Sequence, residues 1–172
     1  MLGELQEGVG RDGHAAVGDT GLTQALGKVG KAADLGADVY AAAGALRRAG
    51  EALAGAEGQT QARWQLMSVV SEQPLSVARA ARRLGVARRG VQRIAVNLVR
   101  DGLAEFQGNP DHLTSPLLTL TDAGQRVLGA ITVRAAPAHQ VMGEGISVDD
   151  LAAARSVLQR LTQQTDIWTG AP

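Results

Sequence analysis

The chain has 172 residues, equal numbers of basic and acidic side chains, and no cysteine. This length suits one domain with a substantial core, and the lack of cysteine excludes disulfides, thiolate metal sites and thiol redox chemistry. The sequence contains no run of about 20 apolar residues that could span a membrane. Residues 1–19 are rich in glycine and charge and have no apolar signal-peptide core, so we expect a cytoplasmic protein.

The positive charge is concentrated in one stretch of the chain. Residues 60–104 contain eight arginines and two acids, a net charge of +6, whereas residues 1–59 and 105–172 each carry −3. A basic block of this kind is typical of a surface that binds a polyanion. The alternative is a solvated basic helix face, and the apolar spacing inside the block decides between the two.

Residues 1–19 are predicted to form a flexible N-terminal arm, and residues 20–58 an N-terminal dimerisation region. We expect mainly helix over residues 20–54, which the recurring glycines could interrupt. Each glycine weakens a helix by about 1 kcal/mol relative to alanine. Such a helix needs a partner surface, and small side chains let that surface come close.

Residues 59–121, which contain the basic block, are predicted to form a separate lobe. Thr60 is a candidate N-cap for a helix that ends before Pro74, with Trp64, Met67 and Val70 as its buried stripe. Ser76 is a candidate N-cap for a short helix that ends at Gly85, and a further helix begins near Ala87. The apolar residues of these two helices recur at i, i+3, i+4 and i+7: Val77, Ala80, Ala81 and Leu84 in one, and Val91, Ile94, Ala95 and Leu98 in the other.

Two short helices joined by a tight glycine turn predict a helix-turn-helix. Ala81 must be small where the helices touch, and Gly85 supplies the positive φ of the turn. On the second helix, Arg89, Arg93 and Arg100 lie opposite the apolar face. A recognition helix offers its N-terminal residues to base edges in the major groove.

We expect Arg89 and Gln92 to read bases, because arginine pairs with guanine and glutamine with adenine. Two candidate strands, residues 103–106 and 117–120, bracket an Asn-Pro-Asp turn and predict a hairpin wing. Arg88 and Arg93 occupy base-reading positions as well, and a phosphate contact is the alternative for Arg93 and for Arg100. Arg79 and Arg82 are expected to hold the DNA backbone. The lobe of residues 59–121 is thus predicted to bind DNA. The DNA-binding candidates are Ser76, Arg79, Arg82, Arg88, Arg89, Gln92, Arg93, Arg100, His112 and Thr114.

Residues 122–172 are predicted to form C-terminal dimerisation helices. Thr121 caps the first of them, and Pro137 should kink or end it. Ser147 caps the last helix, whose apolar seam suits helix–helix contact and consists of Leu151, Ala154, Leu158, Leu161 and Trp168. The predicted fold class is mainly α with a small β-hairpin wing: a winged helix-turn-helix lobe plus a helical dimerisation region.

Over residues 35–168 the chain resembles the MarR family of bacterial transcription regulators. The segments that carry the resemblance are 63–67, 75–78, 88–93, 101–103 and 120–124, the last being a Leu-Thr-x-x-Gly sequence directly after the wing. The resemblance implies a homodimer whose first and last helices interlock. It also implies two winged lobes that reach successive major grooves of a pseudo-palindromic operator. Many members of the family are repressors released by a small-molecule ligand.

The chain departs from the family at the tip of the wing. Arginine is common there and enters the minor groove, but residues 111–115 contain none. The resemblance also implies a ligand pocket between the dimer helices and the lobe. Trp64, Met67 and His139 are its candidate residues, and the alternative for Trp64 is a place in the core.

The sequence thus predicts a homodimeric, sequence-specific DNA-binding regulator, a repressor released by a small molecule, whose partners are double-stranded DNA, a second copy and the effector. The alternatives are a winged-helix protein-interaction module and a ligand-binding module without specific DNA binding. No nucleophile motif, phosphate loop or pair of catalytic acids is present, and the three histidines lack metal-ligand spacing. We therefore predict a protein that is not an enzyme, with no catalytic residue, cofactor or metal.

Overall fold

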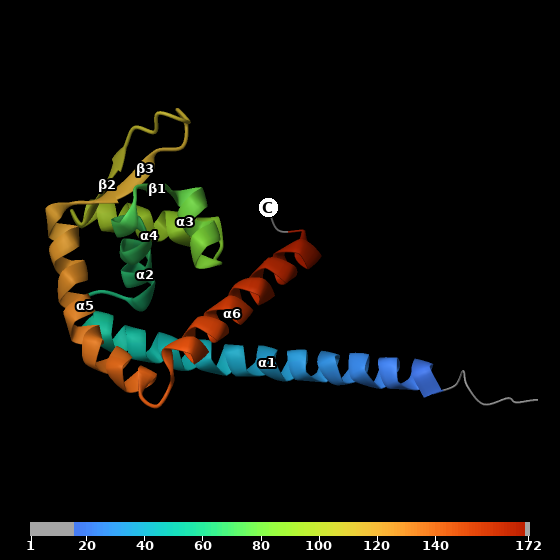
Figure 1. Cartoon of the computed structure of the whole chain (residues 1–172). Helices are drawn as coiled ribbons and strands as arrows, with labels where there is room; N and C mark the ends of the chain where they lie inside the picture. Colours follow the sequence, from blue (N-terminus) through green and yellow to red (C-terminus); the bar gives the residue numbers. More distant parts are fainter. Residues whose placement is uncertain (1–15, 171–172) are drawn as a thin grey trace, which may run out of the picture. The chain divides into compact units, whose positions relative to one another are not determined.

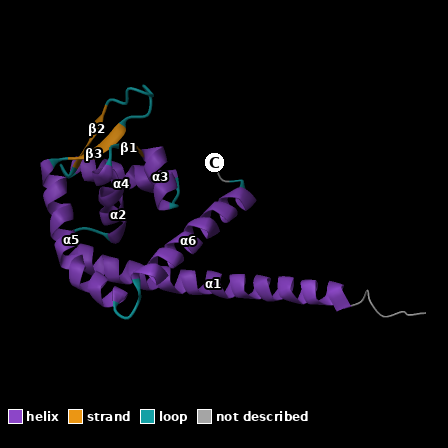
Figure 2. Ribbon diagram, viewed as in Figure 1, coloured by secondary structure: helices purple, strands orange, loops and turns teal. Residues whose placement is uncertain are grey.

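The computed structural model describes residues 16–170, which form six helices and three short strands (Figures 1 and 2). By their contacts the described residues divide into two units, with the boundary between Ala49 and Gly50. Most of the predicted N-terminal arm lies outside the described residues. Within them, no helix has the length and hydrophobicity needed to cross a membrane.

Helix α1 (Ala16–Gly55) is continuous over 40 residues. It begins about four residues before the expected start, and its glycines do not interrupt it. Because the segment contains no proline and is rich in alanine, it can absorb the weakening that each glycine causes. The large side chains of Leu26, Val29, Tyr40 and Leu46 are exposed in the single chain.

Three helices of the lobe begin and end where local signals predict. The N-cap of α2 (Gln61–Glu72) is Thr60, whose Oγ1 accepts a hydrogen bond from the Arg63 amide at 3.2 Å. The N-cap of α3 (Val77–Leu84) is Ser76, and its C-cap is Gly85 at a φ of 64°. The third, α4 (Arg88–Arg100), has Ala87 at its N-cap and no side-chain cap bond.

The wing is part of a three-stranded antiparallel sheet. Strand β2 (Ala104–Gln107) pairs with β3 (Leu117–Leu120), which confirms the predicted hairpin, although β2 begins one residue later than expected. A third strand, β1 (Leu75–Ser76), pairs with the other edge of β3 and was not predicted. Two residues are too few to show the alternation that identifies a strand.

The core of the lobe lies where α2, α3, α4 and the sheet meet (Figure 1). Met67 and Val70 are buried on α2 as predicted, whereas Trp64 is only half-buried and Leu66 is fully buried. The difference arises because α2 contacts α3, α4, α5 and β3, so that its buried face is wider than one stripe. The largest fully buried side chains are Leu66, Met67, Leu98, Leu118, Ile131, Val70 and Val91.

The Leu-Thr-x-x-Gly sequence after the wing has a clear physical basis. The Thr121 hydroxyl donates to the Gly102 carbonyl at 2.7 Å and accepts from the Gly124 amide at 3.1 Å, so it both caps α5 (Asp122–Gly143) and ties it to the end of α4. A Cβ on Gly124 would lie 1.9 Å from the Leu103 carbonyl oxygen. Glycine is therefore required where α5 crosses the chain that leads into β2.

Helix α5 does not end at Pro137 but continues to Gly143, and its ribbon changes direction along its length (Figure 1). The last helix, α6 (Val148–Thr169), starts at the predicted cap, where the Ser147 hydroxyl accepts from the Asp150 amide at 3.0 Å. No side chain of α6 is buried. The predicted apolar seam of this helix is therefore open to solvent in the single chain.

Candidate nucleic-acid interface

Helices α3 and α4 present most of the basic block to solvent. Three of its eight arginines form ion pairs: Arg63 and Arg100 with Asp101, and Arg83 with Glu72. The other five are exposed, and none of the ion pairs found within residues 16–170 involves them; they are Arg79, Arg82, Arg88, Arg89 and Arg93. The surface thus has five guanidinium groups free to meet an anion.

Helix α4 has the two-faced character expected of a recognition helix. Val91, Ala95 and Leu98 are buried, while Arg89 and Arg93 are exposed on the opposite side. The 13 residues give a rod about 20 Å long and about 10–12 Å across with its side chains. A rod of this diameter fits the major groove of B-DNA, which is about 12 Å wide.

The turn between α3 and α4 is held by backbone hydrogen bonds. The Gly85 and Val86 amides donate to the Arg82 and Ala81 carbonyls at 3.2 and 3.1 Å, a pattern that closes the C-terminus of α3. The positive φ of Gly85 makes this closure possible. The basic side chains of both helices are therefore held in a defined arrangement.

Two clefts join the helix-turn-helix to the wing. The first has a volume of about 230 Å³ and brings Arg88 and Gln92 of α4 together with Thr114 of the wing and Phe106 of β2. The second, of about 410 Å³, brings Ser76 and Arg79 together with His112. Six of the predicted DNA-binding residues thus line two clefts, although they come from segments far apart in the sequence.

Ser76 differs from the other candidates because it is buried. Its side chain is 6% exposed, and its hydroxyl accepts from the Arg79 amide at 3.4 Å. The structure therefore gives Ser76 a capping role at the start of α3. A DNA contact by this residue stays a prediction.

The wing loop is held by its own polar groups. The Asn109 Nδ2 donates to the Ser115 carbonyl at 2.8 Å, and the Asp111 amide donates to Asn109 Oδ1 at 3.1 Å. The Thr114 hydroxyl lies 3.2 Å from His112 Nδ1. Leu113, at the tip of the wing, is 98% exposed. The loop of residues 111–115 thus presents an aliphatic side chain to solvent and contains no arginine.

We compared the sequence of the chain with protein families and with known proteins. No protein-family model matches the chain. The uncharacterised protein Rv2011c of Mycobacterium tuberculosis is 56% identical over 129 residues, which cover 75% of this chain and 90% of the relative. The chain belongs to the same family as this mycobacterial protein.

Solved structures identify the fold. The crystal structure of CouR from Rhodococcus jostii RHA1 bound to p-coumaroyl-CoA matches with a TM-score of 0.69 and 20% identity, over 74% of this chain and 91% of CouR. A mutant of Escherichia coli MarR complexed with operator DNA matches with a TM-score of 0.63 and 18% identity, over 74% of this chain and 93% of that one. The chain has the MarR-type winged-helix fold. This confirms the predicted fold class.

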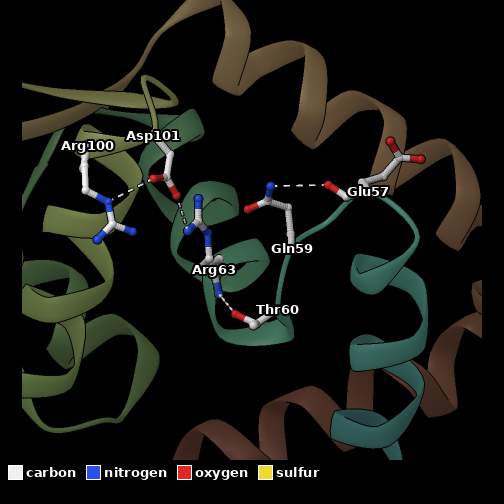
Figure 3. Close-up of polar contacts among 6 residues, drawn as sticks. All are labelled: Glu57, Gln59, Thr60, Arg63, Arg100 and Asp101. Carbon is white, nitrogen blue, oxygen red and sulfur yellow. Dashed lines mark hydrogen bonds and ion pairs between the residues drawn. The ribbon is translucent and has the colours of Figure 1, made fainter.

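In this MarR-type lobe, a polar network that the sequence did not reveal joins α2 to α4 (Figure 3). Arg63 Nη1 lies 2.7 Å from Asp101 Oδ2, and Arg100 Nε lies 3.2 Å from Asp101 Oδ1. Hydrogen bonds from Arg63 and then from Arg100 lower the pKa of Asp101 below its usual value, and partial desolvation opposes them. Arg63 and Asp101 are 38 residues apart, so no local pattern could have predicted their contact.

The three candidate ligand residues of this MarR-type fold have different surroundings. Met67 is fully buried in the core, Trp64 is half-buried and packs against the core, and His139 is exposed on α5. None of them lines either of the two clefts beside the wing. The packing of Trp64 against the core agrees with the alternative prediction that this residue belongs to the core. A ligand-binding role for Trp64, Met67 and His139 stays a prediction. Among the residues that the structure describes, no group of histidine and acidic side chains could hold a metal ion.

Proposed function

We propose that the protein is a homodimeric, sequence-specific DNA-binding transcription regulator that acts as a repressor and is released by a small-molecule ligand. The observation that carries the proposal is the free basic face of α3 and α4. Its five arginines that form no ion pair within residues 16–170 are exposed, and they stand on helices whose opposite faces are buried in one core. The proposal includes a cytoplasmic location, where the chromosome is accessible.

The residues of α4 and those of α3 have different roles in this proposal. Arg89 and Gln92, in the N-terminal half of α4, are placed to read base edges in the major groove. Arg79 and Arg82 on α3 are placed to bind phosphates, which fixes the register but carries no sequence information. His112 and Thr114 add two weaker polar contacts from the wing, because neither carries a permanent positive charge.

The exposed seam of α6 supports the homodimer. Leu151, Leu158 and Trp168 are all exposed in the single chain, and none of the side chains of α6 is buried. A second copy would cover these apolar side chains and would supply a second recognition helix. The two half-sites should then lie about 34 Å apart, one turn of B-DNA.

The ligand part of the proposal is supported by the fold that the chain shares with CouR, which was crystallised with p-coumaroyl-CoA. Trp64 and His139 offer an aromatic ring and an ionisable imidazole, and Met67 adds a polarisable side chain from the core. We expect the effector to lower operator affinity by favouring a dimer in which the two α4 helices no longer match the half-sites.

Selection of bound fragments from the genomic DNA of the source organism tests the proposal. We expect a small set of pseudo-palindromic sites whose affinity falls steeply with salt, because every neutralised phosphate releases counterions. Replacing Arg89 by alanine should relax base preference and cost about 1–3 kcal/mol at the preferred site. Arg126→Ala, which removes an exposed arginine from α5, is the control and should change neither. Binding without any sequence preference, or no binding, would favour the protein-interaction or ligand-binding alternatives.

A further inference from the structure

The network at the C-terminal end of α4 points to a role for Arg63, a residue that the proposed function leaves unused. We propose that Arg63 is a positioning residue for DNA binding. It holds and neutralises Asp101, so that Arg100 can leave this carboxylate and bind a DNA phosphate instead. This inference rests on the proposed function, because it concerns how the same basic face meets DNA.

Arg63 and Arg100, the two partners of Asp101, differ in their exposure to solvent and in their distance from its carboxylate. The side chain of Arg63 is 16% exposed, that of Asp101 is 36% exposed, and that of Arg100 is 70% exposed. The inner contact is also the shorter one, at 2.7 Å compared with 3.2 Å. A short ion pair with one largely covered side chain outlasts a longer pair whose arginine is exposed, because an exposed pair contributes little. Asp101 is therefore held by Arg63, and Arg100 is free to exchange its partner.

Arg63 is well anchored and has one charged partner. It lies in the first turn of α2, where its amide is bonded to the Thr60 cap, and its side chain reaches Asp101 at the end of α4 (Figure 3). Within the described residues, neither Arg63 Nε nor the nearby Gln59 Oε1 has a hydrogen-bond partner. Asp101 is therefore the counter-charge that Arg63 has among the described residues, and a largely shielded cation needs one.

The charge of Asp101 matters because of where it lies. Residues 60–104 contain two acids, and Glu72 is paired with Arg83. Asp101 follows Arg100 directly, so an uncompensated carboxylate there would repel the phosphate that Arg100 is to bind. Its pKa is lowered by the two arginines, so the group stays ionised near neutral pH and its charge has to be balanced by a neighbour.

A double-mutant cycle of charge-neutralising substitutions, made in the full-length protein and measured on a selected operator, tests this role. The net charge of the Arg63–Asp101 pair is zero in the wild type, −1 in Arg63→Gln, +1 in Asp101→Asn and zero again in the double variant. At low salt we expect Arg63→Gln to weaken operator binding about threefold and Asp101→Asn to tighten it about threefold. The double variant should bind within about twofold of the wild type, because repulsion and attraction are removed together.

Two controls separate charge from position. Arg63→Lys keeps the positive charge and should bind nearly as the wild type does. Arg134→Gln removes the same charge from a different ion pair, with Glu57 at 2.8 Å, and should leave operator affinity unchanged. Replacing Arg100 by glutamine should reduce the slope of log affinity against log salt by about one phosphate contact.

The affinities of the two single variants and of the double variant together test the proposed role of Arg63. If both single variants weaken binding and the double variant is not restored, Arg63 and Asp101 merely hold the fold together, and the inference is wrong. Should Arg63→Gln lose its helical signal by circular dichroism, Asp101→Asn alone decides: binding weaker than that of the wild type overturns the inference. A wild-type protein that selects no DNA sequence at all would instead overturn the proposed function.

Discussion

In the winged lobe, α2, α3 and α4 each turn apolar side chains into a shared core, whereas α6 buries none of its side chains. In both regions apolar residues recur at helical spacing along the sequence. The difference is the surface that each one meets: the lobe covers its own apolar faces, and α6 leaves its seam open. In the proposed homodimer a second copy covers the seam of α6, whereas the lobe has a core of its own. The following predictions test that contrast.

The largest effect is expected in the core of the lobe. Leu98 is fully buried on α4, and its replacement by alanine should lower the free energy of unfolding by about 2–5 kcal/mol, because it leaves a cavity. Val96→Ala on the exposed side of the same helix should change it by less than about 0.5 kcal/mol. Urea unfolding of both variants gives the comparison. Equal effects would mean that α4 is not packed as described.

The next effect concerns the crossing of α5 over the chain before β2. Gly124→Ala places a Cβ against the Leu103 carbonyl and should destabilise the protein by about 3 kcal/mol, since the backbone has to move. Gly129→Ala, in the same helix with nothing within 4 Å of the added carbon, should stabilise it by about 0.5–1 kcal/mol. Opposite shifts in the thermal midpoint confirm the prediction, and a tolerated Gly124→Ala would contradict it.

A smaller effect on stability, but a clear effect on assembly, is expected in α6. Leu158→Asp puts a charge into the exposed seam and should shift the protein towards monomer in analytical ultracentrifugation, with a loss of operator affinity of about tenfold, or 1.4 kcal/mol. Gln159→Asp introduces the same charge one position away and should leave the dimer intact. A Leu158→Asp variant that stays dimeric would exclude this seam from the interface.

The smallest effect should appear in the pH dependence of stability. The pKa of Asp101 is lowered in the folded chain from its usual 3.8, so its contribution to folding is complete above that value and is lost as the pH falls through the folded pKa. On acidification below about pH 4, the wild type should lose more stability than Asp101→Asn does. Parallel urea titrations at several pH values measure the difference, and superimposable curves would rule it out.

Local signals in the sequence were enough to place most of the elements. Thr60, Ser76, Thr121 and Ser147 all proved to be N-caps, and Gly85 has the predicted left-handed conformation. These features depend on residues within one turn of each other, because a cap bonds an amide two or three positions away. The free basic face of α4 was predictable for the same reason, since the helical period alone separates its arginines from its apolar residues.

The tertiary structure decided the features that depend on residues far apart in the chain. The burial of Leu66, the pairing of β1 with β3 and the contact between Arg63 and Asp101 each join segments that the sequence keeps separate. The need for glycine at position 124 arises only because the Leu103 carbonyl passes against α5. Capping and helical periodicity are properties of neighbouring residues and can be read along the chain, but the crossing of two segments depends on the whole fold.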